Sequence, residues 1–151
     1  MYYTGIGSRK TPDNILKQMT QIAKSLRIQG FTLRSGGANG ADSAFEQGAG
    51  DKKDIYLPWK EFNASQSSLV LVDMQLKEDA YKIAYQYHPN WMACNAAARA
   101  FMARNSFQVL GDDLISPSEF VICWTPDKKI CGGTGQAIRI ANDHNIPVMY
   151  L

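Results

Sequence analysis

The sequence predicts an α/β protein, a three-layer Rossmann-like domain with a mostly parallel central sheet. Short apolar runs alternate with segments of helical periodicity along the 151 residues, and three glycine-rich turns each follow an expected strand. Strands that alternate with helices pair in parallel through right-handed crossovers. We therefore expect a single domain over residues 1–151, with residues 59–80 as a candidate insertion.

The first half of the chain contains residues that are typical of the starts and ends of strands and helices. Thr11 is expected to cap a helix that has Pro12 at its first position, and Gly30 is expected to end that helix. Apolar residues between these points follow helical spacing. We expect strands at residues 2–7, 31–34 and 55–58, and helices at residues 12–29 and 41–49.

The second half begins with residues 59–75, which have no clear periodicity. His88, Pro89 and Asn90 break the helical pattern that precedes them, and the long alanine-rich segment after them favours a second helix. Residues 120–124 are an apolar run, typical of a strand covered on both faces. We expect helices at residues 76–87, 91–109 and 134–144, and strands at residues 120–124 and 147–151.

Each glycine-rich turn lies where a strand is followed by a helix. The turns cover residues 4–9, 35–42 and 131–136. Glycine permits positive φ and a close approach of ligand to backbone, and a helix N-terminus offers free N–H groups to an anion. Because the carboxyl ends of parallel strands share one edge, the three turns are expected to meet there. This pattern predicts a nucleotide-like small molecule held by its phosphate.

The composition and charge of the chain limit the classes of partner that we expect it to bind. The formal net charge is +2, from 16 basic and 14 acidic residues, which is too weak to indicate nucleic-acid binding by itself. A nucleic acid is therefore an alternative partner that the charge does not favour. The three cysteines form no metal spacing with His88 or His144, so we expect reduced thiols, a cytoplasmic protein, no metal and no cofactor. No apolar run approaches the length of a membrane helix, and no signal-peptide pattern opens the chain.

Several of these segments resemble a known group. Residues 35–44 resemble the SGGA-x-G-x-D motif of the SLOG superfamily, which includes Smf/DprA DNA-processing proteins, LOG nucleotide phosphoribohydrolases and YspA-like proteins. Residues 5–9 are similar to its G-x-GSR start, and residues 132–135 to the GG-x-G phosphate turn of LOG enzymes. Arg104 and Asn105 look like the RN pair of YspA-like members. The resemblance extends over nearly the whole chain apart from residues 59–80.

This resemblance and the glycine turns together imply a ligand site, and the resemblance also implies a homodimer or higher homo-oligomer. Asp42 is expected either to cap a helix or to accept hydrogen bonds from ribose, and Arg104 either to face solvent or to contact the ligand. Arg34, at a strand end, is expected at an exposed edge or directed at an anion. The candidate ligand and phosphate residues are Gly7, Ser8, Arg9, Ser35, Gly36, Gly37, Gly40, Asp42, Arg104, Asn105, Gly132, Gly133, Thr134 and Gly135.

One departure from the LOG pattern affects the predicted function. The position of the LOG catalytic glutamate falls on Arg139, and cleavage of a glycosidic bond normally needs a carboxylate near the sugar. We therefore predict a sensor or sequestering protein for a nucleotide or ADP-ribose-like ligand, with no catalytic residue assigned. Two alternatives remain: an N-glycosidase for nucleoside monophosphates, with Glu46, Glu61 or Asp73 as replacement acid, and a module that binds single-stranded DNA.

Overall fold

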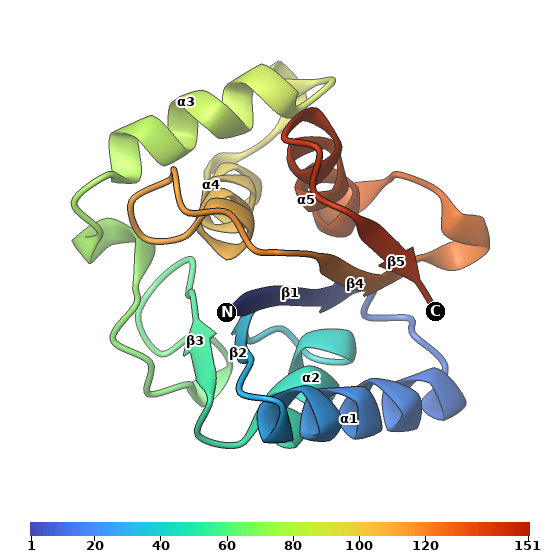
Figure 1. Cartoon of the computed structure of the whole chain (residues 1–151). Coiled ribbons are helices and arrows are strands. Elements are labelled where there is room, and N and C mark those ends of the chain that lie inside the picture. Colours follow the sequence, from blue (N-terminus) through green and yellow to red (C-terminus); the bar gives the residue numbers. More distant parts are fainter.

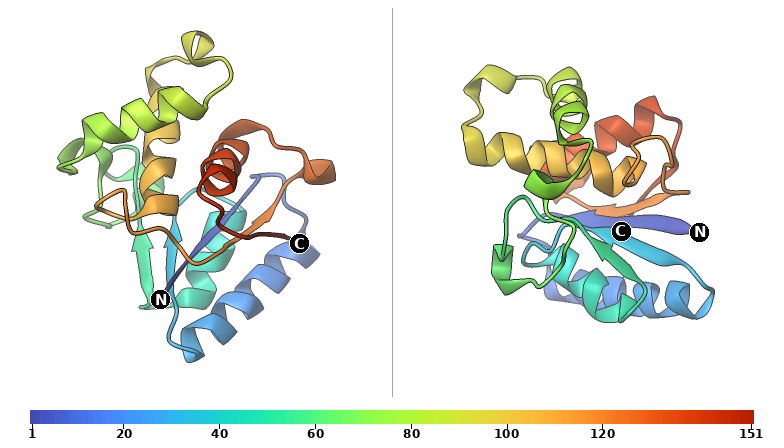
Figure 2. Two further views of the ribbon diagram at one scale, coloured as in Figure 1. Left: turned by 45° about the horizontal axis from the view of Figure 1, so that its top comes forward. Right: turned by 90° about the vertical axis from the view of Figure 1, so that its left-hand side faces the viewer.

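A five-stranded parallel sheet forms the middle layer of the computed structural model, which describes residues 1–151 (Figure 1). Helices cover both faces of the sheet (Figures 1 and 2), which confirms the predicted three-layer α/β fold. No helix is both long enough and apolar enough to cross a membrane. The strands are β1 (Tyr2–Gly7), β2 (Thr32–Ser35), β3 (Lys53–Ile55), β4 (Val121–Trp124) and β5 (Val148–Tyr150); the helices are α1 (Asp13–Ile28), α2 (Ala41–Ala49), α3 (Lys77–Tyr87), α4 (Ala96–Leu110) and α5 (Gly132–Asp143).

The strand order is β3-β2-β1-β4-β5, and every neighbouring pair is parallel. The chain first moves outward from β1 through β2 to β3, and then returns to the other side of β1 for β4 and β5. Such a reversal makes a crevice outside the carboxyl ends of the two central strands, where ligands bind in open α/β sheets. In this chain the reversal lies between β1 and β4.

Two glycines allow α2 to pack closely against β1. A Cβ at Gly5 would lie 2.6 Å from the Cγ atom of Phe45, and one at Gly7 would lie 2.6 Å from the Cβ atom of Ala41. Both separations are too short for real atoms, so any larger residue would displace α2. The close approach brings the start of α2 to the carboxyl end of β1.

The core consists of one apolar cluster on each face of the sheet. The larger cluster contains 19 buried residues, including Phe107 and Ile138, and lies under α3, α4 and α5. The smaller contains 12, including Met19 and Phe45, and lies under α1 and α2. Burial of one such large side chain contributes about 1.5–3 kcal/mol. The two clusters fix both helical layers on the sheet and therefore the crevice between them.

Three expectations about the elements are corrected. Thr11 does not cap α1; its hydroxyl donates to the Ser8 carbonyl at 2.6 Å, and Pro12 directly precedes the helix. The expected helix at residues 91–109 is a short 3₁₀ turn followed by α4, because the Asn95 side chain accepts the Ala98 N–H at 2.8 Å and starts a new helix. The third strand lies at residues 53–55, and Leu57 forms an isolated parallel bridge with Val70.

The segment without periodicity is part of the packed fold. It contains the 3₁₀ turns η1 (Phe62–Ala64) and η2 (Leu71–Asp73). Val70 and Leu71 are buried in the two core clusters. The Asn63 side chain donates to the Gly37 carbonyl at 2.9 Å, which ties η1 to the second glycine turn.

Candidate functional site

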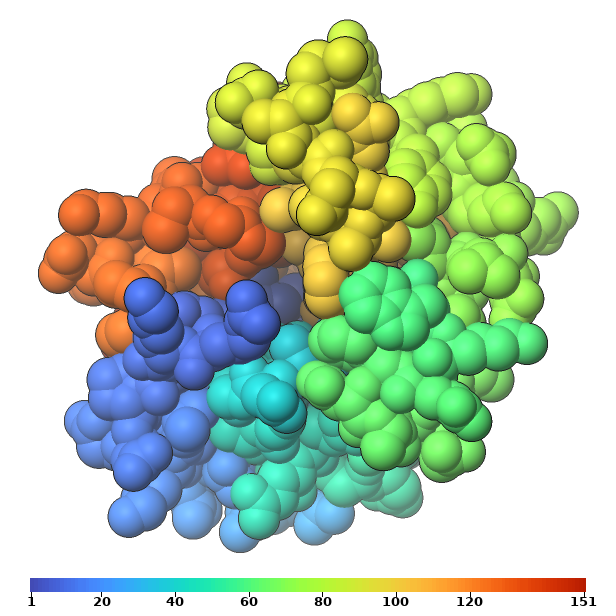
Figure 3. Space-filling view, turned by 180° about the vertical axis from the view of Figure 1, so that it is seen from behind, coloured from blue at the N-terminus to red at the C-terminus, as the bar shows by residue number.

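A cleft of about 550 Å³ lies at the carboxyl ends of β1 and β4. Its walls are the turn after β1, the second glycine turn, η1, α4, the loop after β4 and the start of α5. Figure 3 looks onto this face, where these segments surround a central hollow. The three glycine-rich turns therefore meet at one place. The candidate residues that line the cleft are Gly7, Ser8, Arg9, Asp42, Arg104, Asn105, Gly132, Gly133 and Thr134.

The N-terminus of α5 forms one wall and offers free backbone donors. Gly132, Gly133 and Thr134 are the first residues of this 12-residue helix, so their N–H groups have no acceptor within the helix. The Gly135 N–H makes the first bond of the helix, to the Cys131 carbonyl at 2.8 Å. Three free amides and the positive end of the helix dipole favour an anion at this wall.

Asn105 holds this wall in position. It is 4 % exposed, and its Nδ2 atom donates to the Gly133 carbonyl at 2.8 Å. The bond links α4 to the first turn of α5 and sets the direction of the amides there. Asn105 therefore lines the cleft and positions the α5 amides, while its amide oxygen remains an acceptor.

Arg104 is directed into the protein rather than toward an open surface. It is 5 % exposed, and its guanidinium donates to the carbonyls of Gly36 and, at 3.1 Å, of Tyr56. Burial lowers the pKa of Arg104 to about 10, and the charge of Asp42 opposes that shift. Because Gly36 lies against this guanidinium, a Cβ at Gly36 would overlap it. Arg104 thus fixes the second glycine turn, and the expectation of a solvated surface arginine is wrong.

Asp42 supplies the negative charge of the cleft. Its Oδ2 atom accepts the Ala38 N–H at 3.2 Å. Burial raises the pKa of Asp42 to about 6, while the charge of Arg104 and the backbone bonds from Ala38 and Gly36 lower it. The Ala38 and Gly36 amides of the second glycine turn are thus already used by a carboxylate of the protein. An external phosphate therefore fits the third turn better than the second.

Five candidate residues do not line the cleft, because their conformation or packing builds the turns. The Ser35 hydroxyl donates to the Gly5 carbonyl at 2.7 Å, and the Gly37 carbonyl accepts from Asn63. Gly36 lies under Arg104. The remaining two are Gly40, which has a φ of 88° directly before α2, and Gly135, whose Cβ would lie 2.7 Å from the Ile130 carbonyl carbon.

Sequence reasoning missed two polar residues at the bottom of the cleft. Gln108 is 1 % exposed and Thr125 is 3 % exposed, and both line the cleft. The Nε2 atom of Gln108 and the Oγ1 atom of Thr125 are buried without a hydrogen-bond partner, as is the Nε atom of Arg104. A buried polar atom without a partner costs about 1–3 kcal/mol, so a polar ligand that reaches these atoms is favoured. Gln108 lies one helical turn after Arg104, a spacing that places both on one face of α4.

Aromatic side chains form the wall opposite α5. Phe62 and Phe101 line the cleft with ring centroids 5.4 Å apart. Trp59, 39 % exposed, packs edge-on against both at 5.3 and 5.1 Å. Aromatic faces of this kind stack on nucleobases.

Four exposed cations surround the mouth. Arg9 and Lys10 line the cleft and are exposed. Lys128 and Lys129 are exposed in the loop between Pro126 and Cys131, both of which line the cleft, and Lys129 pairs with Asp127 of the same loop at 3.6 Å. The mouth thus carries positive charge on two sides.

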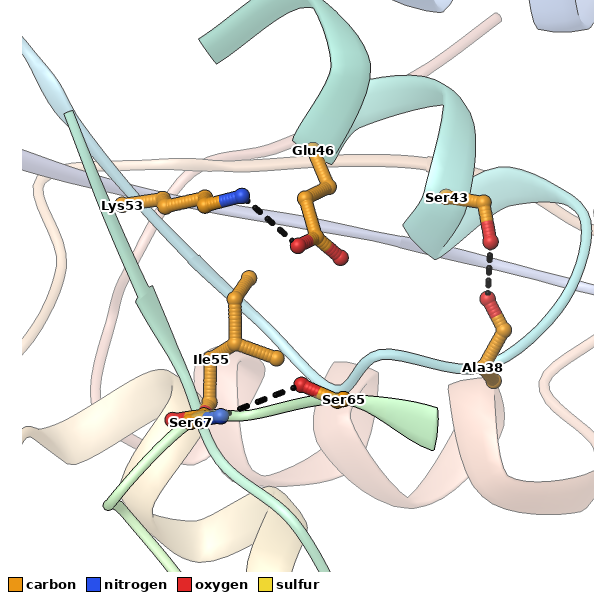
Figure 4. Close-up of polar contacts among 7 residues, drawn as sticks. All are labelled: Ala38, Ser43, Glu46, Lys53, Ile55, Ser65 and Ser67. Carbon is orange, nitrogen blue, oxygen red and sulfur yellow. Dashed lines mark hydrogen bonds and ion pairs between the residues drawn. The ribbon is translucent and has the colours of Figure 1, made fainter. Parts of the chain in front are cut away.

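The other charged candidates lie elsewhere. Glu46 pairs with Lys53 at 2.7 Å and ties α2 to β3, near the Ser43 bond to Ala38 (Figure 4). Glu61 and Asp73 are exposed outside the cleft. Asp42 is therefore the one carboxylate among the lining residues.

Two further arginines have structural partners. Arg34 is 4 % exposed and donates to the Ser116 carbonyl at 2.7 Å, so it is neither at an open edge nor at the cleft. Arg139, at the position of the LOG glutamate, donates to the Tyr87 carbonyl at 2.8 Å and does not line the cleft.

No protein-family model matches the chain, and no curated protein matches its sequence. Among solved structures, the chain is similar to DNA processing protein A from Helicobacter pylori, described for a unique single-stranded DNA binding mode. The two superpose with a TM-score of 0.65 at 19% sequence identity, over 99% of this chain and 64% of the other. The likeness shows a shared Rossmann-like fold of the DprA type. The chain spans about 64% of the length of that protein.

Proposed function

We propose that the protein binds single-stranded DNA and seats one nucleotide of the strand in the cleft between β1 and β4. The observation that carries this proposal is the cleft itself, where free α5 amides, aromatic rings and exposed cations face one space. Proteins that bind single strands combine positive charge for the backbone with aromatic faces for the bases. The shared fold with a protein described as binding single-stranded DNA adds support.

Each wall has a separate role in this proposal. The amides of residues 132–134 and the Thr134 hydroxyl hold a phosphate, while Arg9 and Lys10 attract the strand to the mouth. Phe62 and Phe101 receive the base. The Asp42 carboxylate lies between these walls and accepts a hydrogen bond from the sugar.

Fluorescence anisotropy with labelled oligonucleotides tests the proposal. We expect binding of a single-stranded 12-mer and much weaker binding of the matching duplex, whose stacked bases cannot reach Phe101. The Phe101→Ala variant should bind about tenfold or more weakly, because stacking on an aromatic side chain contributes about 1–3 kcal/mol per base. Tyr85→Ala, which removes an exposed aromatic ring of α3 outside the cleft, serves as the control. The absence of binding to any single-stranded oligonucleotide would contradict the proposal.

A second candidate function is binding of a free nucleotide-derived ligand, as a sensor or sequestering protein. The cleft volume of about 550 Å³ favours it, because small-molecule sites usually measure about 300–1,000 Å³. Glycoside hydrolysis generally uses two carboxylates, and Asp42 is the one that lines this cleft, so we expect nucleotides to be recovered intact. Calorimetry with nucleoside monophosphates and ADP-ribose, followed by chromatography of the ligands, separates this function from strand binding.

A further inference from the structure

We infer that the cleft recognises a terminal phosphomonoester of a nucleotide, rather than the phosphodiester inside a strand. This inference rests on the proposed function, and it specifies the substrate as a phosphorylated strand end. A free nucleoside monophosphate carries the same group and is the other source of this chemistry. Three observations lead to the inference: the closed bottom of the cleft, its set of donors and its low total charge.

The bottom of the cleft is closed by buried residues from three elements. Ile6 at the end of β1 is 4 % exposed, Gln108 of α4 is 1 % exposed, and Thr125 after β4 is 3 % exposed. On the face that Figure 3 views, chain segments lie around the hollow. A cleft of about 550 Å³ above such a floor has room for a single nucleotide, which suits the end of a strand or a free nucleotide.

The donors around the α5 wall outnumber the free oxygens of a phosphodiester. A phosphomonoester has three acceptor oxygens and a charge of about −1.5 to −2 at pH 7, whereas a diester has fewer free oxygens and less charge. The cleft offers the amides of residues 132–134 and the Thr134 hydroxyl. Thr125 and Gln108 also line the cleft, but their unpartnered polar atoms are buried, and the Nε2 atom of Gln108 lies toward Gly36. The amides and the Thr134 hydroxyl match a phosphomonoester, which has more acceptor oxygens than a diester.

Low net charge argues against recognition along a strand. The chain carries a formal charge of +2, and the exposed cations near the cleft are Arg9, Lys10, Lys128 and Lys129. A groove that follows a backbone over many nucleotides needs a continuous line of positive charge. Here the positive charge gathers around one opening, as expected for a site that receives one end.

The experiment compares strand ends in the same anisotropy assay. The probes are labelled 12-mers of one sequence with a 5′-phosphate, a 3′-phosphate or hydroxyl groups at both ends. The competitors are circular single-stranded DNA and free thymidine monophosphate. We expect a phosphorylated end to bind at least tenfold more tightly than the hydroxyl probe and circular DNA to compete poorly. Competition by the monophosphate would show that the end group suffices.

Two outcomes separate the inference from the proposed function. Equal affinity for phosphate and hydroxyl ends, with full competition by circular DNA, would overturn the inference and leave single-strand binding intact. Binding of thymidine monophosphate without binding of any oligonucleotide would overturn the proposed function and support phosphomonoester recognition.

A matched pair of variants at Gly133 tests the position of the phosphate. A Cβ at Gly133 would meet nothing closer than the Asn105 Nδ2 atom, at 3.7 Å, so a side chain is accommodated. Gly133→Asp places a negative charge at the α5 wall, and Gly133→Asn places a neutral side chain of the same shape. We expect the Asp variant to bind the phosphorylated probe at least tenfold more weakly than the Asn variant does, and to have the smaller end preference of the two. Equal end preference in the two variants, with both shown to be folded by circular dichroism, would overturn the inference.

Discussion

At the scale of single residues, the cleft combines charges that the protein satisfies internally with donors that it leaves free. Arg104 and Asp42 are almost fully buried, and both are bonded to the second glycine turn. Thr125 and Gln108 are buried as well, but each has a polar atom without a partner. The first pair builds the site, and the second pair has hydrogen-bonding atoms that are buried and unused.

Asp42 makes stability depend on pH. Burial raises its pKa from 3.8 to about 6, so between these values the native state binds more protons than the unfolded state. The stability that protonated Asp42 contributes is present below pH 4 and is lost as pH rises through about 6. Asp42→Asn retains an acceptor for the Ala38 N–H without the charge. We expect equal stability of variant and parent at pH 4, and a gain for the variant on the order of 2–3 kcal/mol at pH 8.

Urea unfolding of both proteins at pH 4, 6 and 8 measures this difference. Glu46→Gln is a suitable control, because Glu46 is more exposed and pairs with Lys53 at the surface. A variant at Asp42 that is less stable than the parent at pH 8 would show that the carboxylate is stabilised in its charged form.

Arg104 supports the second glycine turn, and its loss leaves the carbonyls of Gly36 and Tyr56 without their donor. We expect Arg104→Ala to lower the free energy of unfolding by about 2–4 kcal/mol, through unsatisfied buried groups and a cavity. Arg27→Ala, at an exposed position of α1, should change it by less than about 0.5 kcal/mol. Chemical denaturation measures both. A loss at position 104 no larger than the loss at position 27 would disagree with a supporting role.

At the scale of elements, the position of α5 relative to α4 decides where the free amides point. The Asn105 bond to the Gly133 carbonyl is the polar link between these helices at the cleft. We expect Asn105→Ala to lower stability by about 1 kcal/mol and to weaken binding of a phosphorylated oligonucleotide, because the first turn of α5 loses its anchor. Asn142→Ala, exposed near the other end of α5, is the control. Unchanged affinity in the Asn105 variant would show that the packing of α5 positions the amides without this hydrogen bond.

The sequence predicted the turns and most elements, because glycine positions and apolar periodicity act locally. The helix at residues 41–49 and the place of the cleft follow directly from residues 36–42. The predicted helix starts at residue 91, whereas α4 starts at Ala96. The helical pattern of the alanine run continues across Asn95, so the cap at that residue is not apparent in the sequence. Gln108 and Thr125 were missed because their role depends on burial at a point where α4 meets the sheet, which no local spacing reveals.

At the scale of the whole molecule, strand order brings distant segments together. The reversal between β1 and β4 places residues 7–9 beside residues 132–134, although more than half of the chain separates them. A homodimer, a cytoplasmic location and the ligand roles of the candidate residues stay predictions. Size-exclusion chromatography with light scattering tests the first of them.

The distribution of charge over the whole surface predicts a modest dependence of DNA binding on salt. Arg9, Lys10 and Lys128 are the exposed cations near the mouth that form no ion pair, and they imply a slope of about −2 for log affinity against log salt, taking ~0.7 per neutralised phosphate on a single strand. Arg9→Ala should reduce the magnitude of this slope by about 1 at most. Anisotropy titrations between 50 and 300 mM salt, roughly the range in which such slopes are measured, give the value. A much steeper slope would indicate an extended track for the backbone instead of one opening.

The position of Cys131 allows ligand binding in the cleft to be detected by chemical labelling. This thiol is exposed at the rim, one residue before the free amides of α5, whereas Cys123 is a buried residue of β4. In a Cys94→Ser background, alkylation by a small maleimide reports on the rim alone. A bound molecule that covers the start of α5 would shield the sulfur, so the labelling rate becomes a direct gauge of which compounds enter.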